Sequence, residues 1–262
     1  MPLSGGNFLD PRARERMIDL SIGYASLALF GASIVVLIWF LMSGIGRGEE
    51  MGDAITREIE RATDGRGDAR ATFDALLTLA WGLLHSLTAR PRFKVRMQKI
   101  LRPHLFPAFY SIVASAGLIL LCCFYRPIPR EIYALEGGAA LLVRIIFYAG
   151  WALFIYCWMH IDLLEIVGLR PIFRYLDNQA APSEPFRPSG PFLWVRHPVE
   201  LAFLVAFWAA PRMSAGHLLF ASLMTLYTFL GVDLEDRRML DLYGSGYGEY
   251  LKKVPQIIPL PR

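Results

Sequence analysis

The chain alternates between long apolar stretches and shorter polar segments. Residues 21–42, 103–125 and 213–232 each contain at least 20 residues without a single Asp, Glu, Lys or Arg. A helix of about 20 apolar residues is long enough to cross the hydrocarbon core of a bilayer. The pattern therefore predicts three transmembrane helices at these positions.

Three further apolar stretches are shorter or carry a polar residue. They cover residues 75–89, which include His85, residues 137–161, and residues 198–210, which number only 13. With these included we expect six transmembrane helices, so that both termini lie on the same side of the membrane. The predicted fold class is an all-α, polytopic integral membrane protein, in which residues 198–232 form a C-terminal helical hairpin.

The composition agrees with a membrane location. Hydrophobic residues make up 55% of the chain and charged residues 19%, and the mean hydropathy is +0.39. Such values exclude a soluble Rossmann enzyme and an intrinsically disordered chain. All three cysteines lie within apolar stretches, so we expect neither a disulfide framework nor a zinc cluster.

Lys and Arg residues are distributed unequally between the two sides of the six-helix arrangement. The N-terminus, residues 90–102, residues 162–197 and the C-terminal tail together carry 18, whereas the loops on the other side carry eight. Because positive residues concentrate in cytoplasmic segments, we expect both termini to be cytoplasmic. The Lys and Arg residues of the cytoplasmic segments also explain the net charge of +4. We therefore do not expect nucleic-acid binding.

The most informative polar residues flank the last two predicted helices. Pro198 lacks an amide hydrogen and fits the first turn of a helix, which places Arg196 and His197 at the helix mouth. This helix leads away from that side of the membrane, and the next apolar stretch returns to it. The return brings Glu235 and Asp236 to the same rim as His197.

The two arms of the predicted hairpin are unequal. At about 1.5 Å per residue the first arm spans about 20 Å and the second about 30 Å, so His197 is expected to lie deeper than Glu235. Taken singly, each group has an ordinary structural explanation. Arg196 fits an interfacial anchor, His197 a hydrogen-bond donor at a helix end, and the pair Glu235-Asp236 a solvated helix end.

Taken together, these residues resemble a known family. The run Arg196-His197-Pro198, the acidic pair Glu235-Asp236 and the tyrosines that follow are similar to the C-terminal region of the isoprenylcysteine carboxyl methyltransferase superfamily of integral-membrane methyltransferases. The resemblance implies that residues 190–258 bind S-adenosylmethionine without a Rossmann fold and without a metal. The cofactor-binding residues that it implies are Leu193, Arg196, His197, Pro198, Glu235, Asp236, Tyr247 and Tyr250. A tyrosine usually stands in place of Glu200, whose carboxylate requires a partner at membrane depth.

Two upstream runs narrow the resemblance. Residues 85–94 are similar to a run in bacterial methanethiol S-methyltransferases, and residues 162–170 are similar to a segment that those enzymes share with nurim. The methyltransferase core then covers residues 72–262, and residues 1–71 form an N-terminal transmembrane helix and a charged loop. The resemblance implies methylation of a small hydrophobic thiol, methanethiol giving dimethyl sulfide, in the bacterial inner membrane.

A thiol reacts as its thiolate, so the site needs a group that removes the proton. The catalytic candidates are Asp162, Glu165 and His85. Asp162 and Glu165 are three residues apart and share a helix face. A structural explanation stands beside each candidate: His85 as a histidine hydrogen-bonded within the bundle, and the two acids as a solvated pair.

Other functions fit parts of the sequence. A nurim-like membrane protein without enzymatic activity would keep the fold, and a methyltransferase for a lipid, an amine or a prenylated carboxylate would keep the cofactor site. A haem or metal redox protein is disfavoured because the five histidines scatter to both predicted membrane faces. The expected partners are the thiol substrate and membrane lipid, with no obligate protein partner.

Overall fold

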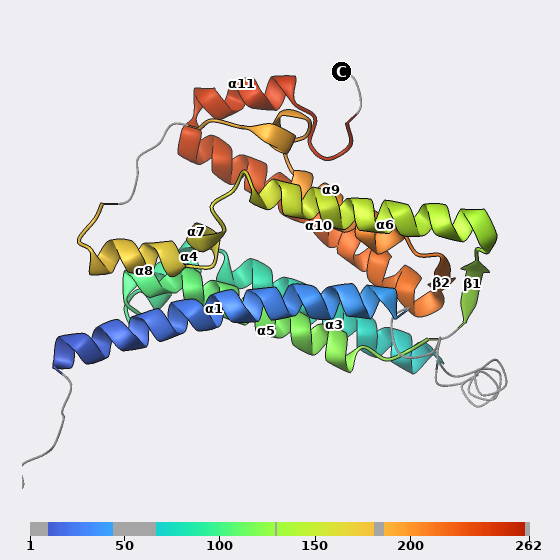
Figure 1. Ribbon diagram of the computed structural model, residues 1–262, viewed down its shortest axis with the longest axis horizontal. Helices are drawn as coiled ribbons and strands as arrows, with labels where there is room; N and C mark the ends of the chain where they lie inside the picture. Colours follow the sequence, from blue (N-terminus) through green and yellow to red (C-terminus); the bar gives the residue numbers. More distant parts are fainter. Residues whose placement is uncertain (1–9, 44–66, 129, 181–185, 260–262) are drawn as a thin grey trace, which may run out of the picture.

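The computed structural model describes residues 10–43, 67–128, 130–180 and 186–259. It shows a bundle of long helices, with shorter helices gathered at one end and a two-stranded sheet at the other (Figure 1). The prediction of an all-α protein is confirmed apart from this small sheet. The charged loop expected before residue 72 lies mostly outside the described residues.

Helices occupy all six predicted stretches. In chain order they are α1 (Pro11–Met42), α3 (Gly67–Thr88), α5 (Phe106–Phe124), α6 (Gly137–Trp158), α9 (Pro198–Trp208) and α10 (Ala215–Tyr243). The shorter elements are α4 (Pro91–Met97), η1 (Pro103–Leu105), β1 (Glu131–Ala134), α7 (Leu163–Ile166), α8 (Leu169–Leu176), η2 (Gly190–Leu193), β2 (Arg212–Ser214) and α11 (Ser245–Lys253).

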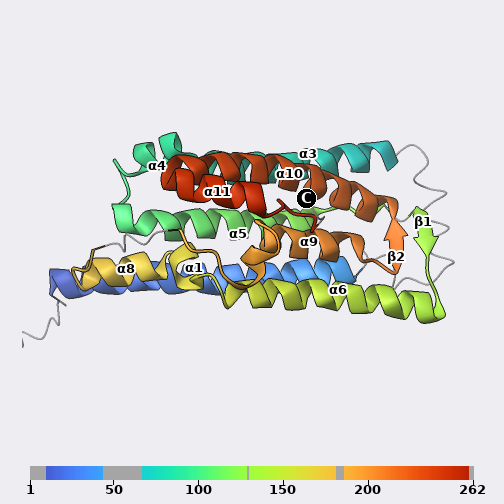
Figure 2. The same cartoon turned by 90° about the horizontal axis from the view of Figure 1, so that it is seen from above.

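The long helices form two sides of the bundle (Figures 1 and 2). On one side α1 packs mainly against α5, and α3 also contacts α5; on the other side α6 packs against α9. Helix α10 runs diagonally and contacts both α3 and α9. It therefore connects the two sides.

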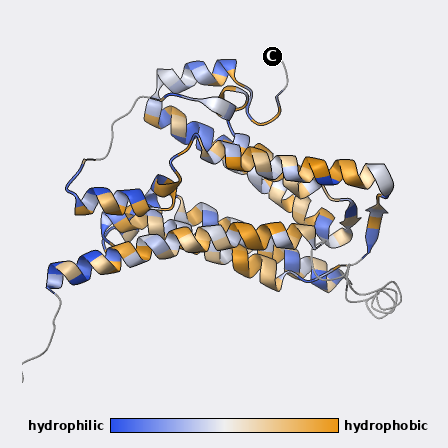
Figure 3. Cartoon of the chain, viewed as in Figure 1, coloured by the Kyte–Doolittle hydropathy of each residue, from blue (hydrophilic) through white to orange (hydrophobic). Residues whose placement is uncertain are grey.

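Four helical stretches have the length and composition needed to cross a membrane: α1, η1 with α5, α6, and α10. Their outward apolar side chains stay exposed, as with Val35 at 66%, Ile155 at 62% and Leu226 at 57%, and apolar residues run along these helices in Figure 3. Lipid covers such a surface, so the protein is an integral membrane protein. Helix α3 begins with polar residues and α9 has only 11 residues, so six spans remain a prediction.

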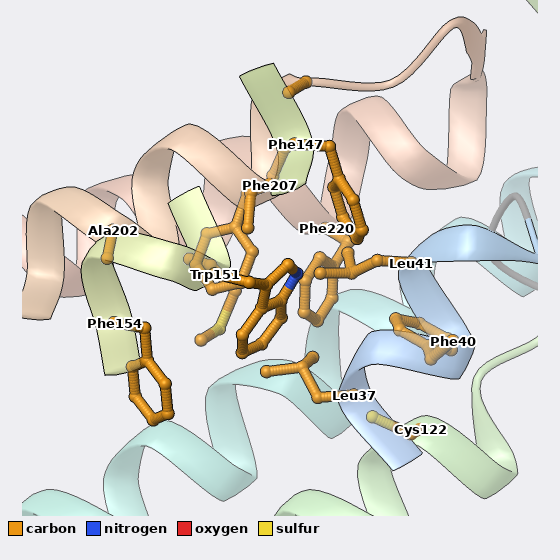
Figure 4. Packing of buried hydrophobic residues seen from close by; sticks show 14 of the residues in the cluster. Leu37, Phe40, Leu41, Cys122, Phe147, Trp151, Phe154, Ala202, Phe207 and Phe220 are labelled. Carbon is orange, nitrogen blue, oxygen red and sulfur yellow. The ribbon is translucent and has the colours of Figure 1, made fainter. Parts of the chain in front are cut away.

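A buried core forms where the two sides of the bundle meet (Figure 4). The ring of Phe220 in α10 lies edge-on to Phe40 of α1 and Phe207 of α9, at centroid distances of 5.2 and 5.4 Å. Leu37, Cys122 and Trp151 complete the contact from α1, α5 and α6. Such edge-to-face packing is a favourable arrangement of aromatic rings, and it fixes α9 and α10 relative to the rest of the bundle.

The connection between α9 and α10 differs from the prediction. We expected a helix over residues 213–232 soon after the one over residues 198–210, but β2 intervenes and pairs antiparallel with β1, with Glu131 opposite Ser214. Ser214 then caps α10, because its hydroxyl accepts a hydrogen bond of 3.1 Å from the amide of His217. The apolar pattern could not show this, because the partner strand lies in a different loop.

Helix α10 also continues beyond its predicted end. It extends past Val232 to Tyr243 and stops at Gly244, where φ is 55°. Glu235 and Asp236 therefore lie on the helix rather than after it. The predicted difference in depth between His197 and Glu235 is wrong, because their side chains lie 3.8 Å apart.

Gly150 allows α6 to approach α9 closely. A Cβ atom at this position would lie 3.0 Å from Cγ1 of Val205, 3.1 Å from the carbonyl oxygen of Ala202 and 3.3 Å from the amide nitrogen of Ala206. Two of these atoms belong to the backbone and cannot turn aside. The spacing of the two helices therefore depends on this glycine.

We expect Gly150→Val to lower the midpoint of thermal unfolding in detergent. The added side chain forces α6 and α9 apart, and overpacking of this kind costs about 1–3 kcal/mol. Gly31→Val is the matched control, because a Cβ atom at this α1 position meets nothing within 4 Å. Equal midpoints for the two variants would contradict the close packing of α6 on α9.

Candidate functional site

The segment that follows α11 is hydrogen-bonded to the start of α9. His197 is the N-cap residue of this helix and Pro198 lies in its first turn. The backbone amides of Arg196 and His197 donate hydrogen bonds to the carbonyl oxygens of Pro255 and Gln256, at 2.8 and 3.0 Å. The segment that follows α11 therefore crosses the mouth of α9.

Asp236 is the centre of a buried hydrogen-bond network. Its Oδ1 atom accepts a hydrogen bond of 2.5 Å from the hydroxyl of Tyr247 and lies 3.0 Å from Nε2 of His197. Its Oδ2 atom accepts hydrogen bonds from Nη2 of Arg196 and from the side-chain nitrogen Nε2 of Gln256, at 2.7 and 3.0 Å. Four side chains from three segments of the chain thus surround one carboxylate, and the residue Asp236 is only 8% exposed.

Arg196 links this network to the tail of the chain. Besides its ion pair with Asp236, it donates a hydrogen bond of 2.6 Å from Nη1 to the carbonyl oxygen of Val254. Both charged residues are buried. Removing one partner of a buried pair leaves an uncompensated charge, which typically costs about 3–5 kcal/mol. The pair is therefore a fixed support for the site.

Two tyrosines of α11 cover the network. The hydroxyl of Tyr250 donates a hydrogen bond of 2.5 Å to the carbonyl oxygen of Phe192 in η2, and the ring of Phe186 packs against both tyrosines. Burial raises the pKa of Tyr250 to about 12, and burial together with the bond to Asp236 raises the pKa of Tyr247. Both hydroxyls therefore stay protonated at neutral pH and act as donors.

The other edge of the His197 ring faces two carboxylates. Its Nδ1 atom lies 3.8 Å from an oxygen of Glu235 and 4.0 Å from an oxygen of Glu200. One atom from each of the three side chains lies within 4.8 Å of the others, and Glu235 is 54% exposed. Two neighbouring carboxylates repel each other unless a positive group lies beside them. This edge is therefore suited to a cationic group.

The structure brings most of the predicted cofactor residues together. Arg196, His197, Asp236 and Tyr247 share the buried network, and Glu235 lies beside it. Pro198 follows directly, Tyr250 is bonded to η2, and Leu193 of η2 is 58% exposed. The binding roles of these residues stay a prediction.

His85 lies in a different part of the bundle, between α3, α5 and α10. Its Nδ1 atom lies 2.7 Å from the hydroxyl of Tyr227, and its Nε2 atom lies 2.9 Å from the hydroxyl of Tyr110. Both ring nitrogens therefore have partners on other helices.

Asp162 and Glu165 are held by arginines of α8. Asp162 caps α7 and forms an ion pair with Arg170. Glu165 accepts two hydrogen bonds from Arg174, at 2.6 and 2.7 Å, and this bond raises the pKa of Arg174. Within the described part of the chain neither carboxylate has a hydrogen bond or ion pair with His85 or His197. Their catalytic role stays a prediction.

Sequence reasoning missed three participants in these clusters. Gln256 has no charge and lies in a tail without a periodic pattern, so nothing in the sequence marked it. Tyr110 and Tyr227 lie within apolar stretches, where a tyrosine is usually read as a packing residue. Only the polar His85 nearby indicated that hydroxyl partners are needed.

Comparison with known proteins identifies relatives of the chain. Methanethiol S-methyltransferase 1 of Bradyrhizobium diazoefficiens is 33% identical over 94% of this chain and 84% of its own length. Methanethiol S-methyltransferase of Mycobacterium tuberculosis is 28% identical over 94% of this chain and 98% of its own length. Nurim of Sus scrofa is 29% identical over 63% of this chain and 70% of its own length. No model of a protein family and no solved structure matches the chain. The similarity to the Bradyrhizobium protein, which extends over nearly the whole sequence, shows that the chain belongs to the methanethiol S-methyltransferase family.

Proposed function

We propose that the protein transfers the methyl group of S-adenosylmethionine to methanethiol and releases dimethyl sulfide. The observation that carries this proposal is the network around Asp236. It joins Arg196 and Asp236, which are 40 positions apart in the sequence. The family resemblance implies that both residues take part in cofactor binding. The names of the relatives specify both methyl transfer and methanethiol.

The charges of the site fit such a cofactor. S-adenosylmethionine carries a positive sulfonium, and the carboxylates of Glu200 and Glu235 supply a negative edge beside His197. Asp236 is already surrounded by donors, so it is not available for a further cation. Glu200 and Glu235 would therefore hold the cationic part, and when bound the cofactor supplies the electrophilic methyl group.

The buried network has a positioning role in this proposal. Its bonds to His197, Arg196 and the C-terminal tail keep the imidazole edge in one orientation. Methyl transfer depends strongly on the alignment of the reacting atoms. The hydrogen bonds on the Nε2 side of the His197 ring therefore hold its Nδ1 side in place for the cofactor.

The three candidates for removing the thiol proton are not equivalent. Asp162 and Glu165 are paired with arginines, and an adjacent positive charge makes a carboxylate a weaker base. His85 is bonded only to neutral hydroxyl groups. We therefore favour His85 as the proton acceptor.

We also propose six membrane spans, a hairpin of α9 and α10, and cytoplasmic termini in the bacterial inner membrane. The start of α1, α4, α8 and α11 lie toward one end of the bundle, and β1 and β2 lie at the other end (Figure 2). The excess of Lys and Arg falls on the first end. The polar cofactor then enters directly from the cytoplasm.

Reporter fusions test this orientation. A fusion at residue 96, in α4, is expected to report the cytoplasm, and a fusion at residue 133, in β1, the opposite side. A reversed result would show that the orientation inferred from the charges is wrong.

Calorimetric titration with S-adenosylmethionine tests the cofactor site. We expect His197→Ala and Glu235→Gln each to weaken binding by about 1–3 kcal/mol, because each loses a contact that involves a charged group. Glu249→Gln is the control for a lost negative charge, because Glu249 is exposed on α11 and bonded to Lys252. Unchanged affinity in both site variants would remove the basis for placing the cofactor here.

Assay of the purified protein with methanethiol tests the reaction. With S-adenosylmethionine present, we expect dimethyl sulfide to accumulate and to be detected by gas chromatography. His85→Gln is expected to lower turnover more than cofactor affinity, whereas Asp162→Asn and Glu165→Gln, whose carboxylates are paired with arginines, should lower turnover less than His85→Gln does. Methylation of a lipid, an amine or a prenylated carboxylate in place of every short thiol would refute the proposed acceptor, and absence of cofactor binding would favour a structural role.

A further inference from the structure

A part-buried polar cluster connects three helices of the bundle. It consists of His85 and Ser86 of α3, Tyr110 of α5 and Tyr227 of α10. The imidazole of His85 lies between the two tyrosine hydroxyls, at 2.7 and 2.9 Å, and the hydroxyl of Tyr227 lies 3.2 Å from that of Ser86. We call these four residues the His85 cluster.

The close packing around the cluster fixes its geometry. The indole of Trp81 lies against both His85 and Tyr227, with ring centroids 5.4 and 5.5 Å apart. Gly82 lets α3 approach α10, because a Cβ atom there would lie 3.0 Å from the Tyr227 ring. The tyrosine is therefore held against the histidine from two directions.

The cluster lies close to the acidic edge that we assign to the cofactor. Tyr227 and Glu235 are both on α10, and eight residues of helix span about 12 Å. Among the described residues, the hydroxyl of Tyr227 lies within hydrogen-bond distance of both His85 and Ser86, whereas the hydroxyl of Tyr110 is bonded to His85 alone. Tyr110 therefore keeps an oxygen lone pair for a substrate.

The hydrogen bonds of His85 differ from those of a purely structural histidine in the same protein. His217 is buried, whereas His85 is partly buried, and the Nε2 atom of His217 lies 2.8 Å from the carbonyl oxygen of Phe207. A carbonyl oxygen only accepts, so it fixes the ring as a donor at that atom. The two hydroxyls on His85 can each donate or accept, so a proton can pass through the ring system.

We propose that Tyr110 and His85 together remove the proton of the acceptor thiol. This inference rests on the proposed function and names the residues that prepare its nucleophile. The S–H bond breaks as the hydroxyl oxygen of Tyr110 takes the proton, and the hydroxyl proton of Tyr110 passes to Nε2 of His85. The thiolate keeps the electron pair that attacks the methyl group, and His85 becomes an imidazolium.

Tyr227 is a positioning residue in this scheme. Its oxygen accepts the hydrogen of Nδ1 on His85, which leaves the lone pair of Nε2 free for the proton from Tyr110. After methyl transfer, Nε2 of His85 returns its proton to Tyr110, whose own hydroxyl proton passes to the water that replaces the product. The cycle therefore ends with the cluster in its starting state.

The need for such a relay follows from the acidity of the substrate. Only a few per cent of a thiol with an ordinary pKa is thiolate at neutral pH. An aromatic thiol that is already largely thiolate at neutral pH does not need the proton acceptor. Comparing the rates of a variant with the two kinds of thiol therefore distinguishes a residue that removes the proton from one that only supports the fold.

The experiment compares methanethiol with such an aromatic thiol in the purified, full-length protein. His85→Gln and Tyr110→Phe are expected to lower kcat/KM for methanethiol by roughly 10²- to 10⁴-fold, the range for general acid–base groups, and for the aromatic thiol by less than about tenfold. Tyr227→Phe should show a smaller loss with the same dependence on the thiol. The affinity for S-adenosylmethionine should stay unchanged in all three variants.

Tyr125→Phe is the matched control. Tyr125 is a buried tyrosine of the same bundle, and its hydroxyl donates only to the carbonyl oxygen of Gly216. Removal of the Tyr125 hydroxyl should leave the ratio of kcat/KM for methanethiol to kcat/KM for the aromatic thiol unchanged. If His85→Gln does not fold, Tyr110→Phe, which keeps the ring, carries the test.

The outcomes separate this inference from the proposed function. Equal losses for both thiols in the Tyr110 and His85 variants, or no loss in either, would overturn the relay while leaving thiol methylation intact. A wild-type protein that binds S-adenosylmethionine but methylates neither thiol would overturn the proposed function and the relay with it.

Discussion

The buried carboxylate of Asp236 is the group on which the rest of the site depends. It balances the charge of Arg196, orients His197 and accepts a hydrogen bond from Tyr247, which lies on α11. Without it, Arg196 would be a buried charge without its counter-ion, which is a costly arrangement. The start of α9, the last turns of α10 and the tail after α11 are therefore held as one unit, although long segments of chain separate them.

The carboxylates on the two sides of the His197 ring differ in their surroundings. On its Nε2 side, Asp236 is enclosed by donors and acts as structure. On its Nδ1 side, Glu200 and Glu235 lie near each other, with solvent able to reach them. The same chemical group is thus a fixed support in one place and a candidate ligand contact in the other, because a carboxylate's behaviour is set by its neighbours.

Most of the fold could be predicted from the sequence, because long apolar runs indicate helices directly. The meeting of His197 with Asp236 could also be expected, since Pro198 marks a helix start and the next helix returns to the same rim. The pairing of β1 with β2 could not, because it joins separate loops. The end of α10 was placed too early, because charged residues fit the polar last turns of a helix as well as its end. Tyr110 and Tyr227 were missed because their hydroxyls find partners only once three helices pack together.

The continuity of α10 also limits how the family can diversify. One uninterrupted helix carries Tyr227, Glu235 and Asp236, so the axial spacing between the His85 cluster and the acidic edge is set by helical rise alone. In the proposed site, a relative that accepts a bulkier thiol cannot lengthen that interval without moving both groups of residues at once. The space for a larger acceptor would then have to come from side chains of α3 or α5.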